Sequence, residues 1–107
     1  MTRIPPLIIE RHPGQGADCL FPVGDIVQAA ATHLGPAWSV GYRAESADCL
    51  VGDDPADTFE VGVDTEGDLF VQAIYATHQI SFFSNATPAD DVDALAVRVA
   101  DAVRRFL

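Results

Sequence analysis

The sequence contains no lysine: its six basic residues are all arginines, against sixteen aspartates and glutamates. The resulting formal net charge of −10 gives the surface a strongly negative potential. Such a surface repels a phosphate backbone and an anionic bilayer, so we expect neither a nucleic-acid partner nor binding to a membrane. A basic protein partner is compatible with this charge.

Long hydrophobic runs are also missing. The apolar run near the N-terminus covers only residues 7–9 and is enclosed by prolines on one side and by Glu10 and Arg11 on the other. A signal peptide needs a longer apolar segment, and a membrane-spanning helix needs roughly 20 apolar residues. The sequence therefore predicts a cytoplasmic protein without a membrane partner.

Only two cysteines are present, Cys19 and Cys49, each within a copy of the tetrapeptide ADCL. Neither belongs to a C-x-x-C pair and the three histidines are scattered, so no metal site is predicted. The first copy leads into a predicted helix and the second into a predicted strand, so the match does not indicate an internal repeat. We expect two separate reduced thiols; the alternative, a disulfide, needs the two Cα atoms within about 7 Å.

Motifs that carry catalysis or bind phosphate are absent as well. No serine lies in G-x-S-x-G, nothing resembles H-E-x-x-H, and the HPGQG segment lacks the G-K-[ST] ending of a P-loop. The acidic turns at 52–57 and 64–68 do not have the glycine spacing of an EF-hand. We therefore predict no cofactor and favour a non-catalytic role, although acid–base catalysis needs only one positioned side chain.

Two amphipathic helices are predicted. The first follows Pro22 and ends before Gly35-Pro36, a typical stop signal. The second is long and C-terminal, with Thr87 as its N-cap and Pro88 in its first turn. Apolar residues recur at helical spacing in both, and the stripe of the second comprises Val92, Leu95, Ala96, Val99, Val103 and Phe106.

Between these helices, short segments alternate apolar and polar residues with the period of two that is typical of half-buried strands. Links rich in Asp, Gly and Pro join them, which favours pairing of consecutive strands into an antiparallel meander. We predict a single two-layer α+β domain over residues 1–107, with both helices on one sheet face and a partly extended arm and loop at 1–16. The predicted order is an edge strand, a helix, five strands at 38–43, 47–52, 58–64, 69–75 and 80–84, and the long helix.

Three large apolar residues are candidates for an interface. If the helices cover the sheet face that carries Phe59, then Phe70, Ile74 and Phe83 are expected on the opposite face. Large apolar side chains on neighbouring strands form a patch of the kind that marks interaction sites. The alternative is that residues 7–9 of the N-terminal arm fold across this face and cover it.

Two functions follow as hypotheses. The favoured one is a small acidic adaptor, chaperone or inhibitor that binds a basic protein, or a second copy as a homodimer, through this patch. The alternative is a small-molecule binder or enzyme with an apolar cavity between the sheet and the C-terminal helix. Its candidate lining residues are Trp38, Tyr42, Phe59, Tyr75 and Phe106, with His78 at the mouth.

Overall fold

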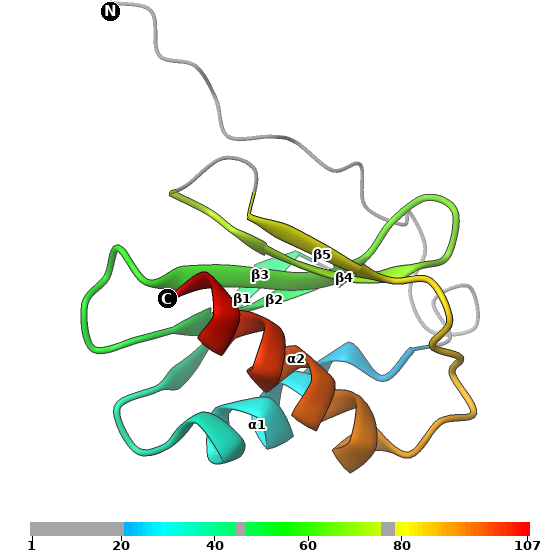
Figure 1. Ribbon diagram of the computed structural model, residues 1–107, viewed down its shortest axis with the longest axis horizontal. Coiled ribbons are helices and arrows are strands. Elements are labelled where there is room, and N and C mark those ends of the chain that lie inside the picture. Colours follow the sequence, from blue (N-terminus) through cyan, green and yellow to red (C-terminus); the bar gives the residue numbers. More distant parts are fainter. Residues whose placement is uncertain (1–20, 45–46, 76–78) are drawn as a thin grey trace, which may run out of the picture.

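The computed structural model describes residues 21–44, 47–75 and 79–107. Their strands form one antiparallel sheet in the order β1-β2-β3-β4-β5, and both helices lie on the same face of it (Figure 1). The predicted α+β meander is therefore confirmed, while the predicted first edge strand, arm and loop lie outside the described residues. The elements are α1 (Val23–Leu34), β1 (Ser39–Ala44), β2 (Ala47–Val51), β3 (Thr58–Val63), β4 (Leu69–Ala73), β5 (Ile80–Phe83) and α2 (Val92–Phe106).

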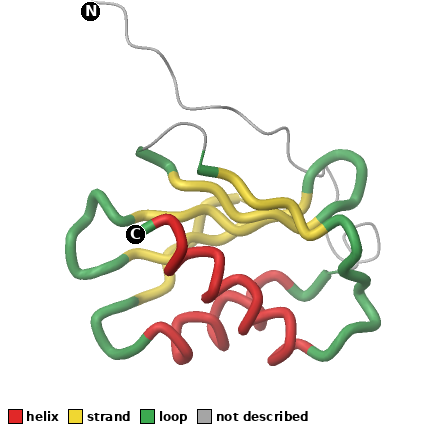
Figure 2. The backbone as a smooth tube through the Cα atoms, in the orientation of Figure 1, coloured by secondary structure: helices red, strands yellow, loops and turns green. Residues whose placement is uncertain are grey.

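The main core lies between the two helices, which are red in Figure 2, and the sheet, which is yellow. Alternate residues of the central strands point into it, because side chains of a strand project to opposite faces in turn. From β3 and β4 these are Phe59, Val61, Val63, Leu69, Val71 and Ala73. The helices contribute their apolar stripes, which in α2 comprise Leu95, Ala96, Val99 and Val103, with Val92 and Phe106 partly buried at its two ends.

The start of α2 differs from the sequence prediction. The helix begins at Val92, and Asp91 is its N-cap, with Oδ2 accepting a hydrogen bond from Ala94 N at 3.1 Å. Thr87 and Asp90 instead close a separate turn, in which Thr87 N donates to Asp90 Oδ2 at 2.9 Å and Asp90 N donates to Thr87 O at 3.0 Å. The prediction of Thr87 as the cap is wrong, because the local bonds that a capping box would use are made within this preceding turn.

The acidic link between β3 and β4 is held by its own first residue. Asp64 Oδ1 accepts hydrogen bonds from Glu66 N at 3.0 Å and from Asp68 N at 2.9 Å. Gly67 completes the turn with a φ of +90°, which side-chain-bearing residues rarely adopt. This carboxylate is thus engaged in backbone bonds, as expected for a structural turn.

We predict opposite effects for alanine at two glycines. Gly67→Ala should lower the free energy of unfolding by about 1–2 kcal/mol, because a Cβ disfavours the left-handed conformation. Gly24→Ala, at an exposed site in α1, should raise it by about 0.5–1 kcal/mol, because alanine favours the helix. An added Cβ at Gly24 meets Asp48 Oδ2 at 3.6 Å, an ordinary contact. Urea denaturation measures both changes, and a Gly67→Ala variant as stable as the wild type would contradict the turn geometry.

Candidate functional site

The sheet face turned away from the helices, called the outer face below, carries the first of the interface candidates. Phe70 of β4 lies there, opposite Gly62 of β3 and Phe82 of β5. The Phe70 side chain is 0% exposed, while Phe82, whose ring centroid lies 6.2 Å from that of Phe70, is 50% exposed. Ile74 follows β4 and is half-buried. The accessible aromatic surface of the outer face is therefore supplied by Phe82, which the sequence interpretation did not select.

Phe83 lies on the other face of the sheet, so its predicted position is wrong. It pairs with Leu69, and both side chains belong to the core beneath the helices. The guanidinium carbon of Arg98 lies 5.2 Å from the centre of its ring. β5 contains two consecutive phenylalanines, and a shift of one residue exchanges the two faces of a strand. Only the pairing with β4 determines which phenylalanine enters the core.

A buried polar pair occupies the middle of the outer face. Glu60 of β3 is 1% exposed, and its Oε1 accepts a hydrogen bond from Gln72 Nε2 of β4 at 3.0 Å. Cys49 of β2 is buried opposite Glu60, while Cys19 lies outside the described residues. A carboxylate removed from water needs such partners, because its desolvation is costly. The centre of the outer face is thus protected from solvent. The sequence pattern did not predict this, because polar residues that alternate with apolar ones, such as Glu60 and Gln72, are normally expected to be exposed.

Three of the cavity candidates pack against one another as an aromatic row. The ring centroids of Trp38 and Phe59 lie 6.1 Å apart, and those of Phe59 and Phe106 also lie 6.1 Å apart. Phe59 is buried, and the other two are partly buried at the edge of the core. The row connects the residue before β1 with β3 and the end of α2, and its three rings contact one another at the edge of the core.

The remaining cavity candidates do not strengthen that alternative. Tyr75 is 72% exposed and therefore does not line an interior space. Tyr42 lies in β1 opposite Asp48 of β2, and His78 lies outside the described residues. In residues 21–44, 47–75 and 79–107, no group of three histidine, cysteine or acidic side chains is placed to hold a metal ion.

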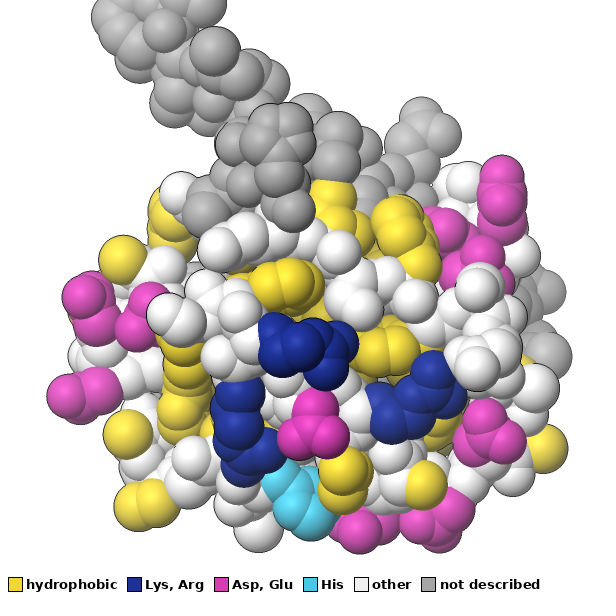
Figure 3. All heavy atoms as spheres, in the orientation of Figure 1, with side chains coloured by type: hydrophobic (Ala, Val, Ile, Leu, Met, Phe, Trp, Pro, Cys, Tyr) yellow, Lys and Arg dark blue, Asp and Glu magenta, His cyan; other side chains and the backbone are white. Residues whose placement is uncertain are grey.

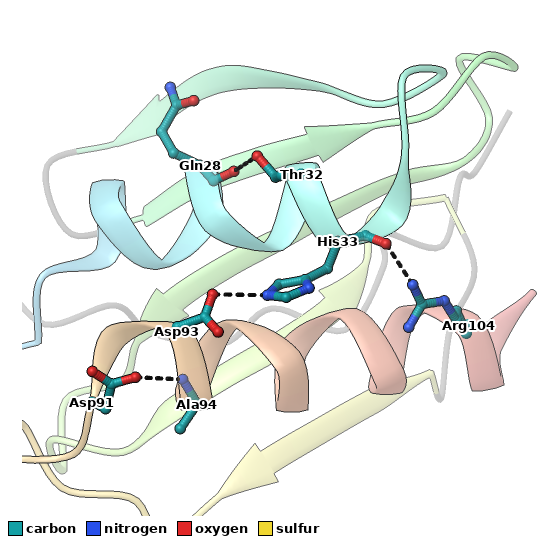
Figure 4. A network of polar contacts seen from close by, with 7 residues as sticks. All are labelled: Gln28, Thr32, His33, Asp91, Asp93, Ala94 and Arg104. Carbon is teal, nitrogen blue, oxygen red and sulfur yellow. Dashed lines mark hydrogen bonds and ion pairs between the residues drawn. The ribbon is translucent and has the colours of Figure 1, made fainter.

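Polar contacts connect α1 to α2 (Figure 4). His33 Nε2 lies 2.8 Å from Asp93 Oδ1, and Arg104 Nη2 donates to the backbone oxygen of His33 at 2.6 Å. Arg104 Nη1 also bonds Asp101 Oδ1 at 3.1 Å, one turn earlier in the same helix. These groups hold the C-terminal end of α1 beside α2, which gives them a structural role.

Charge is unevenly distributed over the surface. The face in Figure 3 gathers arginine side chains, in dark blue, over α2, with most acidic side chains nearer the margins. They come from Arg98, which donates to Asn85 Oδ1 at 2.6 Å, and from Arg104 and Arg105 in the last turn. The negative potential of the chain is therefore weaker over this part of α2 than where acidic side chains gather.

Comparisons with protein-family models, with curated proteins and with solved structures found no match to this chain. Within the described part of the chain, neither helix is long and apolar enough to cross a bilayer.

One acidic residue lies partly buried between the sheet and α1. Asp48 of β2 pairs with Val61 of β3, a core residue, and its carboxylate approaches Gly24 of α1. Burial raises the pKa of Asp48 above its ordinary value of 3.8, because desolvation disfavours the charged form. The folded state thus binds this proton more tightly than the unfolded chain. The free energy of unfolding therefore falls as the pH rises from 3.8, the ordinary pKa, to above the raised pKa of the folded state, because the carboxylate then ionises while partly buried.

We predict that Asp48→Asn raises the free energy of unfolding at pH 7, because the amide carries no charge to desolvate. The gain should shrink as the pH falls toward 3.8, where Asp48 itself becomes protonated. Urea denaturation across this pH range measures the effect. Glu66→Gln, an equal charge change at an exposed turn position, is the control. Equal gains from both variants would indicate a general relief of negative charge and would refute the burial effect.

Proposed function

We propose that the protein is a small acidic, non-catalytic interaction protein that binds a basic protein partner through the outer face of β5. The main support for this proposal is the exposure of Phe82, a large aromatic side chain that is 50% exposed. Ile80, two residues earlier on the same face of β5, is half-buried beside it. We call Ile80 and Phe82 the β5 patch. Exposed aromatic side chains supported by a buried neighbour, here Phe70, are typical anchors of protein interfaces.

The aromatic row supports this function over the small-molecule alternative. Trp38, Phe59 and Phe106 pack together where that alternative needs open volume. An apolar ligand between the sheet and α2 would have to displace these rings and forfeit their contacts. A partner that docks on the β5 patch requires no such rearrangement of the core.

The net charge favours a basic partner over a second copy of the chain. Two copies with a net charge of −10 each repel one another, and the β5 patch offers only two apolar side chains to offset that repulsion. A basic protein is attracted by the same charge, which accelerates its association and disfavours acidic competitors.

We predict that Phe82→Glu strongly weakens partner binding without unfolding the protein. The full chain, tagged and expressed in its own cell, is crosslinked, and captured proteins are identified by mass spectrometry. A partner is then purified, and its affinity is measured by calorimetry. Loss of an interface anchor is expected to weaken binding by at least about 30-fold, equivalent to about 2 kcal/mol.

The control is Val97→Glu, which introduces the same side chain at an exposed apolar position on α2. It should leave the affinity of the purified partner unchanged. Full affinity in Phe82→Glu would refute the β5 patch as the docking site. A protein that captures no partner and sediments as a dimer would show self-association in place of a basic partner.

A further inference from the structure

A groove of about 470 Å³ lies at the opposite edge of the sheet, between the C-terminal half of α1 and β1. The helix contributes Gln28, Ala31 and Thr32, which are three and four residues apart and so share one helix face. The other side is formed by Ser39 and Val40 of β1 and by Trp38, the residue before the strand. This volume is within the range of known ligand sites, and the groove is independent of the β5 patch.

The construction of the groove combines an apolar floor with polar walls. Ala31 is buried, and Trp38 and Val40 are partly buried. Gln28, Thr32 and Ser39 are exposed and carry groups that hydrogen-bond. Such a lining accepts apolar side chains at its base while polar groups orient a bound chain.

The strand beside this groove has an open edge. β1 is the first strand in the sheet order and pairs with β2 along one side only, within the described ranges. The outward backbone groups of an edge strand form a template for a further strand. Extended peptides use this geometry, in which backbone bonds supply affinity and the neighbouring groove selects alternate side chains.

Acidic residues near the groove favour a bound peptide segment that carries positive charge. Ring atoms of Trp38 lie 3.2 and 3.3 Å from the position that a Cβ would take on Gly52, and the Cβ of Asp57 lies 3.1 Å from the same position. The indole therefore packs against the β2–β3 turn, which also exposes Asp53 and Asp54. A lysine or arginine at this end meets both an aromatic ring and carboxylates, two environments that favour a cation.

We infer that this groove binds an extended, basic peptide segment of a partner protein, which adds to β1 as a sixth strand. The lysine or arginine of that segment lies at Trp38 and the acidic β2–β3 turn, and its alternate side chains enter the groove floor. This goes beyond the proposed function, because it assigns a second surface at the other edge of the sheet and the chemistry of its ligand.

The test uses the full chain and a displayed library of random dodecapeptides as the probe. Enriched peptides are expected to carry lysine or arginine beside alternating apolar residues, and their binding should weaken as salt is raised to about 0.5 M. On addition of a synthesised enriched peptide, hydrogen exchange of the β1 amides at residues 39–44 should slow. No enrichment, acidic peptides, or protection at β5 instead of β1 would each overturn the proposal.

Two variants at exposed helix positions complete the design. Thr32→Arg places a bulky positive side chain in the groove and should weaken binding of the basic peptide by about tenfold or more. Val97→Arg, the same charge change on α2, should leave it within about twofold. Phe82→Glu should also leave it unchanged, which separates this proposal from the β5 patch. Equal affinity in wild type and Thr32→Arg would refute the groove as the site.

Discussion

Burial of one apolar sheet face beneath two helices is the constraint on which the rest of this structure depends. A five-stranded sheet presents a wide face, and a single helix would leave part of it open. Many of the helix residues that face the sheet or the other helix are small, among them Ala30, Ala96 and Ala102, all of which are fully buried. Small side chains allow the two helices to lie close together, so that both fit over the same face.

Much of the polar chemistry of the chain serves this arrangement. Asp91 begins α2, Asp93 contacts His33 of α1, and Arg104 binds the last turn of α1. Asp64 likewise holds the turn between β3 and β4. These side chains are engaged in the fold and the centre of the outer face is buried, so the surfaces of the described sheet that stay accessible are the β5 patch and the edge at β1.

Local pattern was sufficient to predict most of the architecture. Alternation and helical spacing located both helices and all five strands, because each signal depends on residues adjacent in sequence. Predictions failed where the outcome depends on strand register or on a choice between two overlapping local turns. Phe83 entered the core because β5 pairs with β4 in a particular register, and Asp91 replaced Thr87 as the cap because the preceding turn closed on itself. The groove beside β1 was not predicted, since it exists only where α1 and β1 approach.

The position of α2 after the whole sheet has a consequence for synthesis. The strands of the described sheet precede residues 92–106 in the chain, so α1 alone covers the inner face of the nascent sheet until α2 emerges. During that interval the core residues of β4, the strand that α2 contacts, are a surface for chaperones or for misassociation with other chains. A premature stop codon before Val92 would make this transient state permanent, and such a chain is expected to be removed by proteolysis.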